Sequence, residues 1–400
     1  MDESTLARFA ALAVDFGANV QPGQIVAVSA GPGKERFARA IAERAYQRGA
    51  KFVDLAWFDP WIKRARIAYA PDDTLEYVPP WYGERVLALG RERAANISLS
   101  GPSAPGLLEG LDPVRAGRDR LPAVRESGEV GNRRELNWTI VPGPTQAWAD
   151  LVHPDLDPSE RFPRLEEQLM HVLRLDEADP VAAWTQRADT LVGVAERLTE
   201  RGFDALRYRG DGTDLTVGLL GGTRWMAARF STAEGIPHMP NLPTEEVFTS
   251  PDPQRVDGHV RSTKPLVLAD GTVVRDLRVE FAGGRVSRLD ASTAQDTMRT
   301  IVQRDEGAAR LGEVALVDGE GRIGALDTVF YDTLLDENAA SHIALGRAFP
   351  FLAADAELGE RLNVSDIHID FMIGAPELEI SGVTQDGDEV PVLVDGRWRI

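Results

Sequence analysis

The feature that most constrains the fold is a change of sequence pattern about halfway along the chain. Before it, short apolar runs alternate with helical patterns. Residues 24–29 and 51–56 are apolar runs, and residues 35–49 between them carry apolar side chains at helical spacing. This order of strand, helix and strand is typical of a parallel sheet covered by helices. Two further runs, residues 95–99 and 137–141, extend the predicted sheet.

The second half of the chain has a different texture. Residues 155–200 have a helical pattern throughout, and from Phe203 onward short β runs are separated by glycine and aspartate turns. Asp-Gly pairs, which favour the tight turns of β-hairpins, occur at 211–212, 270–271, 386–387 and 395–396. We therefore predict an α/β domain over residues 1–200, with a mostly parallel sheet and a helical connector at 155–200. An α+β, largely antiparallel domain with one embedded helix is predicted over residues 201–400.

Composition excludes several kinds of site and partner. The sequence has no cysteine, so disulfides, zinc fingers, iron–sulfur clusters and a cysteine nucleophile are impossible, and any metal site must use imidazole and carboxylate. The formal net charge is 44 − 63 = −19. An acidic chain repels phosphates and anionic lipid, so we expect neither a nucleic-acid nor a membrane partner. The N-terminus is acidic and predicts an amphipathic helix instead of a signal peptide, so we expect a cytoplasmic protein.

One motif of the first domain suggests a phosphate loop but lacks the required spacing. Gly31-Pro32-Gly33-Lys34 follows a predicted strand and precedes a predicted helix. A Walker loop needs a glycine where this chain has Val28 and a hydroxyl residue where it has Glu35. We interpret the motif as a tight strand-to-helix turn.

The second domain contains residues that could bind metal. In residues 366–373 apolar and polar side chains alternate, which places His368 and Asp370 side by side on one face of a predicted strand. Glu313 stands at the start of an apolar strand, and Glu245 and Glu246 stand in a turn before a short apolar run. Each of these features alone is also compatible with ordinary solvated charge.

Residues 335–346 are predicted to begin a helix, with Asp336 or Asn338 as its N-cap. His342 and Phe349 would then lie on the same helix face, two turns apart. Glu337 would have to lie in the cap or the preceding loop to approach His342.

Two histidines and four carboxylates thus fall within one predicted domain. Mixed oxygen and nitrogen donors suit Zn²⁺, Co²⁺ or Mn²⁺, and this number of donors exceeds what one tetrahedral ion needs. It fits a pair of ions that share a bridging carboxylate. The six residues are Glu246, Glu313, Glu337, His342, His368 and Asp370.

At these residues the sequence resembles the thermophilic aminopeptidase family of metallopeptidases, the aminopeptidase T and aminopeptidase S group. The matching segments are 241–266, 312–318, 330–349 and 368–371, with weaker similarity in 137–149 and 179–191. The resemblance implies an aminopeptidase of broad specificity that acts on small peptides, with two divalent metal ions in the second domain, and a homodimer. Carried over position by position, it makes those six residues the metal ligands, with Glu313 as the bridge.

In the mechanism expected from this resemblance, two ions bind the peptide carbonyl and amine, and a bridging hydroxide attacks. Glu245 or Glu313 would carry the proton to the leaving amine. Phe349 occupies the position where the family is expected to have a tyrosine that donates a hydrogen bond, and loss of one such donor can cost roughly 10²–10³ in rate.

Two alternatives stay open. His-x-Asp with a distant histidine resembles the facial triad of a mononuclear iron oxygenase, although here His342 precedes the pair and no histidine follows it. The other alternative is a catalytically impaired, peptide-binding homologue, in which Phe349 reports a lost activity.

Overall fold

The computed structural model describes residues 1–119, 121–122, 124–268 and 272–400. The chain divides into two compact units, which we call unit 1 and unit 2. Unit 1 comprises residues 1–185 and 229–243, and unit 2 comprises residues 186–228 and 244–400. The boundary predicted at residues 200/201 falls at the end of a helix that runs from unit 1 into unit 2, α9 (Pro180–Arg201).

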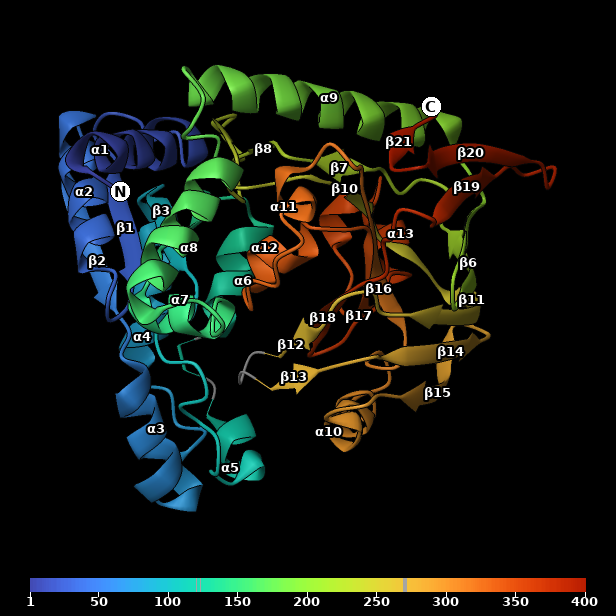
Figure 1. Cartoon of the computed structure of the whole chain (residues 1–400), viewed down its shortest axis with the longest axis horizontal. Helices are drawn as coiled ribbons and strands as arrows, with labels where there is room; N and C mark the ends of the chain where they lie inside the picture. Colours follow the sequence, from blue (N-terminus) through green and yellow to red (C-terminus); the bar gives the residue numbers. More distant parts are fainter. Residues whose placement is uncertain (120, 123, 269–271) are drawn as a thin grey trace. The chain divides into compact units, whose positions relative to one another are not determined.

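Unit 1 is built on a four-stranded parallel sheet flanked by helices, as predicted (Figure 1). The strand order is β2-β1-β3-β4, and the strands are β1 (Ile25–Ala30), β2 (Phe52–Trp57), β3 (Ala95–Ser100) and β4 (Asn137–Pro142). Central residues such as Val26, Val28 and Ile97 are fully buried, which explains their apolar runs in the sequence. The short β8 (Phe230–Ser231) and β9 (Pro237–His238) also belong to unit 1.

The helices of unit 1 follow the strands in the predicted alternation. They are α1 (Glu3–Ala11), the π-helix η1 (Leu12–Gly17), α2 (Glu35–Gln47), α3 (Pro60–Tyr69), the 3-10 helix η2 (Asp72–Thr74), α4 (Pro80–Arg91), α5 (Pro113–Arg118), α6 (Arg125–Asn132), α7 (Gln146–Val152) and α8 (Pro158–Val172). Helix α2 packs on β1 and β2 through a buried apolar stripe that includes Phe37 and Ile41.

The turn before α2 is structural. Gly33 has a φ of +86°, a conformation that glycine adopts without strain. The ammonium of Lys34 is buried and donates to the carbonyls of Leu99, Ser100 and Gly101 at 3.0, 2.7 and 2.6 Å. Lys34 therefore satisfies the carbonyl groups at the end of β3, in keeping with the interpretation of this motif as a turn.

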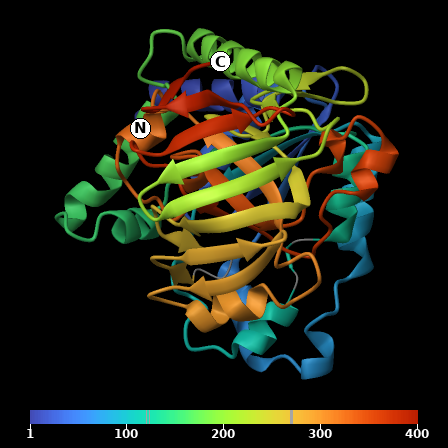
Figure 2. The same cartoon turned by 90° about the vertical axis from the view of Figure 1, so that its right-hand side faces the viewer.

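Unit 2 consists mostly of antiparallel sheet, as predicted. Its larger sheet has eight strands, in the order β15-β14-β11-β6-β5-β19-β20-β21 (Figure 2). The strands are β5 (Ala205–Gly210), β6 (Thr213–Leu219), β11 (Pro251–Arg261), β14 (Arg278–Ala282), β15 (Arg285–Asp290), β19 (Glu379–Val383), β20 (Glu389–Val394) and β21 (Arg397–Trp398). Three of the predicted Asp-Gly turns join β5 to β6, β19 to β20 and β20 to β21, and the pair at 270–271 lies outside the described residues.

The smaller sheet of unit 2 has five strands, in the order β18-β17-β16-β10-β7. They are β7 (Met226–Ala227), β10 (Glu246–Thr249), β16 (Leu311–Val317), β17 (His342–Gly346) and β18 (His368–Met372). A two-stranded ribbon of β12 (Leu266–Val267) and β13 (Val273–Val274) completes the strands. Short helices connect them: α10 (Gln295–Ile301), α11 (Arg322–Ala325), α12 (Thr333–Glu337), the 3-10 helix η3 (Pro350–Leu352) and α13 (Ala356–Glu360).

The five-stranded sheet has two chemically different faces. Val314, Ile343 and Phe371 lie opposite one another across β16, β17 and β18, and all three are fully buried. This apolar face belongs to the core of unit 2, and each such side chain contributes roughly 1.5–3 kcal/mol to the free energy of folding. The other face carries the polar residues of the candidate site.

Candidate metal centre

Strand register brings five of the six predicted ligands to one face of the five-stranded sheet. Glu313 on β16 pairs with Ala344 on β17, and Ala344 pairs with Asp370 on β18. His342 and His368 stand two residues before Ala344 and Asp370 respectively, so they share that face. Glu246 on β10 pairs with Val317, four residues beyond Glu313, and therefore points the same way.

The predicted helix over residues 335–346 is wrong. Helix α12 ends at Glu337, its N-cap is Asp332, and His342 begins strand β17. All five residues of β17 are buried and paired between β16 and β18, and this sheet pairing outweighs the helical tendency of an alanine-rich segment. Asp336, a predicted N-cap, instead accepts hydrogen bonds from the backbone N–H groups of Phe330 and Asp332.

Five of the six predicted ligands form two clusters that share Glu313. One contains Glu246, Glu313 and His342, and the other contains Glu313, His368 and Asp370. Within each cluster the potential ligand atoms lie within 4.8 Å of one another. His342 Nε2 is 3.2 Å from Glu246 Oε2, and His368 Nε2 is 3.0 Å from Glu313 Oε2 and 3.4 Å from Asp370 Oδ1. Ligands at about 2.1 Å from a tetrahedral ion are separated by roughly 3.4 Å, so these pairs are spaced as ligands of a common ion would be.

Both imidazoles have the hydrogen-bonding pattern of metal-binding histidines. The Nδ1–H of His342 donates to the carbonyl of Ala340 at 3.1 Å, and the Nδ1–H of His368 donates to the carbonyl of Arg347 at 2.7 Å. In each ring Nε2 is therefore the nitrogen that faces the carboxylates. Backbone carbonyls that fix the far nitrogen in this way are typical of histidine ligands.

Glu337 lies beside the two clusters without belonging to either. It ends α12, which packs against β18. Burial raises the pKa of Glu337 well above its usual value, and the charges of Asp370 and Glu246 raise it further. The carboxylate of Glu337 is thus close enough to Asp370 and Glu246 for electrostatic repulsion between them.

The electrostatics of the face favour bound cations. Burial lowers the pKa of His342, but the hydrogen bond to Glu246 and the charges of nearby acids outweigh burial and raise the pKa to about 10. Burial and neighbouring carboxylates raise the pKa of Glu313, although its hydrogen bond with His368 opposes this. These shifts reflect the excess of buried negative charge on this face. Two divalent ions would carry four positive charges, which matches the four carboxylates of Glu246, Glu313, Glu337 and Asp370.

Glu245 points away from this face and into a buried ion-pair network. Arg187 Nε is 2.5 Å from Glu245 Oε2, and the two terminal nitrogens of Arg187 donate to Asp318 at 2.9 and 2.8 Å. Glu245 has no exposed surface, and Arg187 is 7% exposed. Burial lowers the pKa of Arg187, but the two carboxylates outweigh burial and raise it.

Arg187 and Asp318 were not predicted from the sequence. Arg187 lies three residues after Trp184 and four before Leu191, both fully buried, so it interrupts the apolar stripe of α9. A charged residue in such a stripe is a signal that could have marked it. Asp318 directly follows the apolar strand β16, where a charge is commonplace and gives no such signal.

Phe349 lies next to the site, although not on a shared helix with His342. Its ring centroid is 5.1 Å from that of His368 and 5.7 Å from that of Phe248. The backbone N–H of Phe349 donates to the hydroxyl of Ser250 at 3.0 Å. An apolar ring therefore stands where the expected tyrosine would present a hydroxyl group.

Comparison with known proteins agrees with this geometry. Residues 2–398 match the family described as thermophilic metalloprotease (M29). The chain belongs to this family. Aminopeptidase T from Thermus aquaticus is 39% identical over 99% of this chain and 98% of its own length, and aminopeptidase AmpS from Bacillus subtilis is 36% identical over 98% and 97%. The structure of wild-type AmpT from Thermus thermophilus covers all of both chains with a TM-score of 0.93 and 38% identity.

Family membership confirms the resemblance deduced from the motifs and makes the protein a hydrolase that acts on peptides. It sets aside the iron oxygenase. Membership also implies divalent metal, and the carboxylate and imidazole donors of the two clusters fit that requirement.

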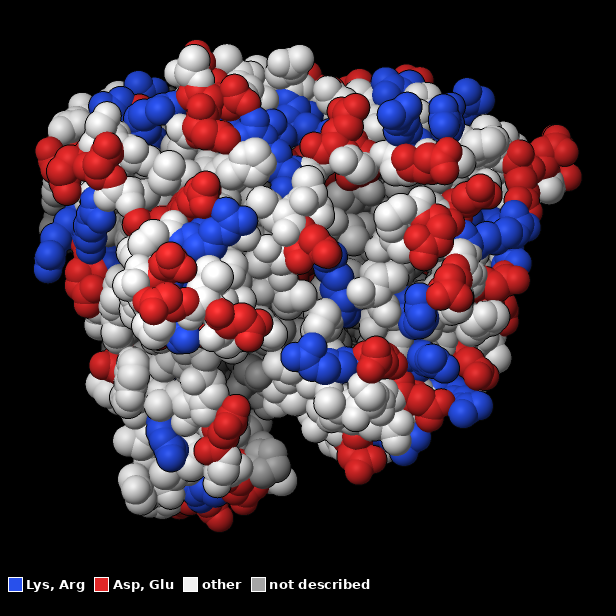
Figure 3. Space-filling model, viewed as in Figure 1, with Lys and Arg blue, Asp and Glu red and all other residues white. Residues whose placement is uncertain are grey.

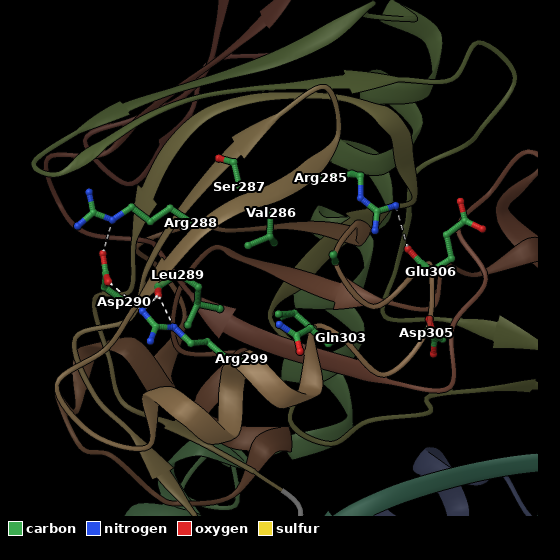
Figure 4. Close-up of a pocket in the computed structure, with 12 residues that line it drawn as sticks. Arg285, Val286, Ser287, Arg288, Leu289, Asp290, Arg299, Gln303, Asp305 and Glu306 are labelled. Atoms are coloured by element: carbon green, nitrogen blue, oxygen red, sulfur yellow. Dashed lines mark hydrogen bonds and ion pairs between the residues drawn. The ribbon is translucent and has the colours of Figure 1, made fainter.

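An open pocket of about 830 Å³ lies between β15 and α10, and none of the predicted ligands lines it. Its arginines Arg288 and Arg299 form ion pairs with Asp290 (Figure 4).

On the face drawn in Figure 3, acidic and basic side chains are interspersed. Among the described residues, no helix is long and apolar enough to cross a membrane.

Proposed function

We propose that the protein is a metal-dependent aminopeptidase that releases N-terminal residues from short peptides through a two-metal site. The observation that carries this proposal is the pair of ligand clusters that share Glu313. Further support comes from the names of relatives such as aminopeptidase T, to which the chain is similar over nearly its whole length.

In this proposal Glu246, Glu313 and His342 hold one ion, and Glu313, His368 and Asp370 hold the other, with Glu337 as an additional ligand. The ions are Zn²⁺, Co²⁺ or Mn²⁺, which accept mixed oxygen and nitrogen donors. When bound, such ions would polarise the scissile carbonyl and supply a hydroxide nucleophile from water.

The remaining chemistry falls to the side chains. Glu313 and Glu245 are the candidates for moving a proton to the leaving amine. Glu313 accepts a hydrogen bond from His368 within the ligand clusters, whereas the carboxylate of Glu245 is held by Arg187. The ion pair with Arg187 counts against Glu245 and leaves Glu313 as the candidate.

We also propose that the protein forms a homodimer, as the resemblance implies. Unit 1 exposes apolar side chains on β2, the edge strand of its sheet, and on α3 and α4. They are Phe52, Leu55, Trp57, Trp61, Ile62 and Trp81. Exposed apolar surface of this extent is typical of protein interfaces, and a second copy is the proposed occupant.

The test combines metal content with peptide release. We expect elemental analysis of the purified protein to give about two divalent ions per chain, since two clusters are present, and aminoacyl nitroanilides to be hydrolysed. Glu313→Gln removes a charge that both clusters share, so it should abolish hydrolysis and lower the metal content. Glu245→Gln should lower hydrolysis much less than Glu313→Gln does, because Glu245 holds no ion in this proposal. Full activity of the Glu313 variant would overturn the site assignment, and metal binding without hydrolysis in the parent protein would indicate the impaired homologue.

A further inference from the structure

A buried ion-pair network lies directly behind the ligand face of unit 2. We call it the Arg187 network; it contains Arg187, Glu245, Asp318 and Trp398. Arg187 comes from α9, and the indole N–H of Trp398 on β21 donates to the same carboxylate of Asp318 that accepts from Arg187. All three charged members are buried, so none of these charges is solvated by bulk water.

The Arg187 network contacts residues next to the two strands that carry Glu246 and Glu313, β10 and β16. Glu245 immediately precedes Glu246, and Asp318 immediately follows Val317, the residue that pairs with Glu246 across β10 and β16. Neighbouring residues of extended backbone point to opposite faces. The guanidinium of Arg187 thus binds Glu245 and Asp318 on one face of the sheet. Glu246 projects from the opposite face.

A second contact extends the network to α12. The backbone N–H of Glu245 donates to the side-chain carbonyl of Asn338 at 2.6 Å, and the amide of Asn338 donates to the carbonyl of Leu334 at 3.0 Å. Asn338 is fully buried and directly follows Glu337. Glu245 therefore joins the strand end that carries Glu246 to the helix end that carries Glu337.

The positions of Glu245 and Asp318 depend on the positive charge of Arg187. Without the guanidinium, Glu245 and Asp318 would lose the ion pairs that link the end of β10 to the end of β16. Both carboxylates would lose the group that fixes their positions, and the end of β10 would shift with Glu245. Lysine could supply the charge but not the fork that binds Asp318 through two nitrogens.

We propose that Arg187 is a positioning residue for the metal centre: it holds Glu245 and Asp318 so that Glu246, and through Asn338 also Glu337, are aligned to bind a cation. This inference rests on the proposed function. It predicts that loss of Arg187 weakens the ion held by Glu246 more than the ion held by His368 and Asp370.

The experiment titrates metal-free protein with Co²⁺ alone and follows heat and the visible absorption of bound cobalt. Arg187→Met should weaken one of the two binding steps by roughly 10–100-fold, the effect typical of losing a partner that orients a ligand. Arg187→Lys should recover part of that loss. Arg299→Met is the matched control, because Arg299 is also an ion-paired arginine of unit 2 but lies on α10, outside the Arg187 network, and this variant should bind Co²⁺ as the parent protein does.

If Arg187→Met does not fold, Asp318→Asn replaces it, since that change keeps the pair between Arg187 and Glu245 and weakens only the bidentate contact. Equal weakening of both steps, or unchanged affinity in a folded variant, would overturn the inference. A parent protein that binds no Co²⁺ would instead overturn the proposed function, so the two failures are distinguishable.

Discussion

Metal binding at this centre should depend steeply on pH, because the proton on His342 must leave before the imidazole can bind a cation. The pKa of His342 in the metal-free protein is about 10, raised by its hydrogen bond to Glu246 and by nearby carboxylates in spite of burial. At pH 7 removal of that proton costs (10 − 7) × 1.36, about 4 kcal/mol. The apparent affinity at pH 7 should therefore be about 1,000-fold below that of the deprotonated site.

The sign of the effect is unambiguous below the pKa. Each unit of rising pH should tighten binding about tenfold for this proton alone, so Co²⁺ titrations at about pH 6.5 and about pH 8.5 should differ by at least about 100-fold. Calorimetry in buffers of different ionisation enthalpy counts the released protons directly. His171→Asn is the control, because His171 is a half-exposed residue of α8 paired with Asp176, and it should leave the slope unchanged. Affinity that stays constant across this range would refute the reasoning.

The stability of the metal-free protein should change in the opposite direction. A histidine whose folded pKa lies above its unfolded value stabilises the fold at low pH. That contribution is fully present below about pH 6.5 and is lost as the pH rises toward the folded pKa of about 10. Urea unfolding of metal-free protein should therefore show falling stability over a range in which metal affinity rises.

Four further substitutions test the ligand face, the apolar face behind it and the exposed apolar surface of unit 1. Phe349→Tyr should raise kcat by up to roughly 10²-fold if a hydroxyl donor is missing from the site, and unchanged turnover in nitroanilide assays would exclude that role. Ala344→Leu should abolish Co²⁺ binding without unfolding the protein, because it fills the space between Glu313 and Asp370. Ile343→Val on the opposite face should cost about 0.5–1.5 kcal/mol of stability and leave metal content unchanged. Trp61→Glu should convert a dimer into a monomer by light scattering, and a monomeric parent protein would contradict the dimer proposal.

The parts of the fold that sequence predicts well are those in which one local pattern decides the outcome. Residues 25–28 are a continuous apolar run, residues 95–99 alternate apolar and polar side chains, and both segments form strands of the parallel sheet of unit 1. The alternation after residue 366 correctly places His368 and Asp370 on one strand face. In these segments burial, β propensity and periodicity all favour the same structure.

Prediction fails where distant strands decide. Residues 338–346 contain several alanines and resemble a capped helix, yet Ser341 exchanges hydrogen bonds with Val317, and the next residues pair with β16 and β18. No local pattern encodes those partners. Burial of Arg187 is equally non-local, since its partners stand 58 and 131 residues away.

Because residues 342–346 form a strand and not the predicted helix, the carboxylate of Glu313 can belong to both clusters. Adjacent strands lie about 4.8 Å apart, so β16 and β18 are separated by roughly 9.6 Å, with β17 between them. Glu313 can meet His368 and Asp370 only by reaching across β17. The β17 residues that lie in this path are Ala344, which pairs with Glu313 and Asp370, and Gly346, which pairs with His368. Gly346 has a φ of +102°, and a Cβ at this position would lie 2.2 Å from the carbonyl oxygen of Ile367. A helix over residues 338–346 would not lie between β16 and β18 with small side chains facing the ligands. The shared centre therefore requires the strand β17, and it requires small side chains at positions 344 and 346.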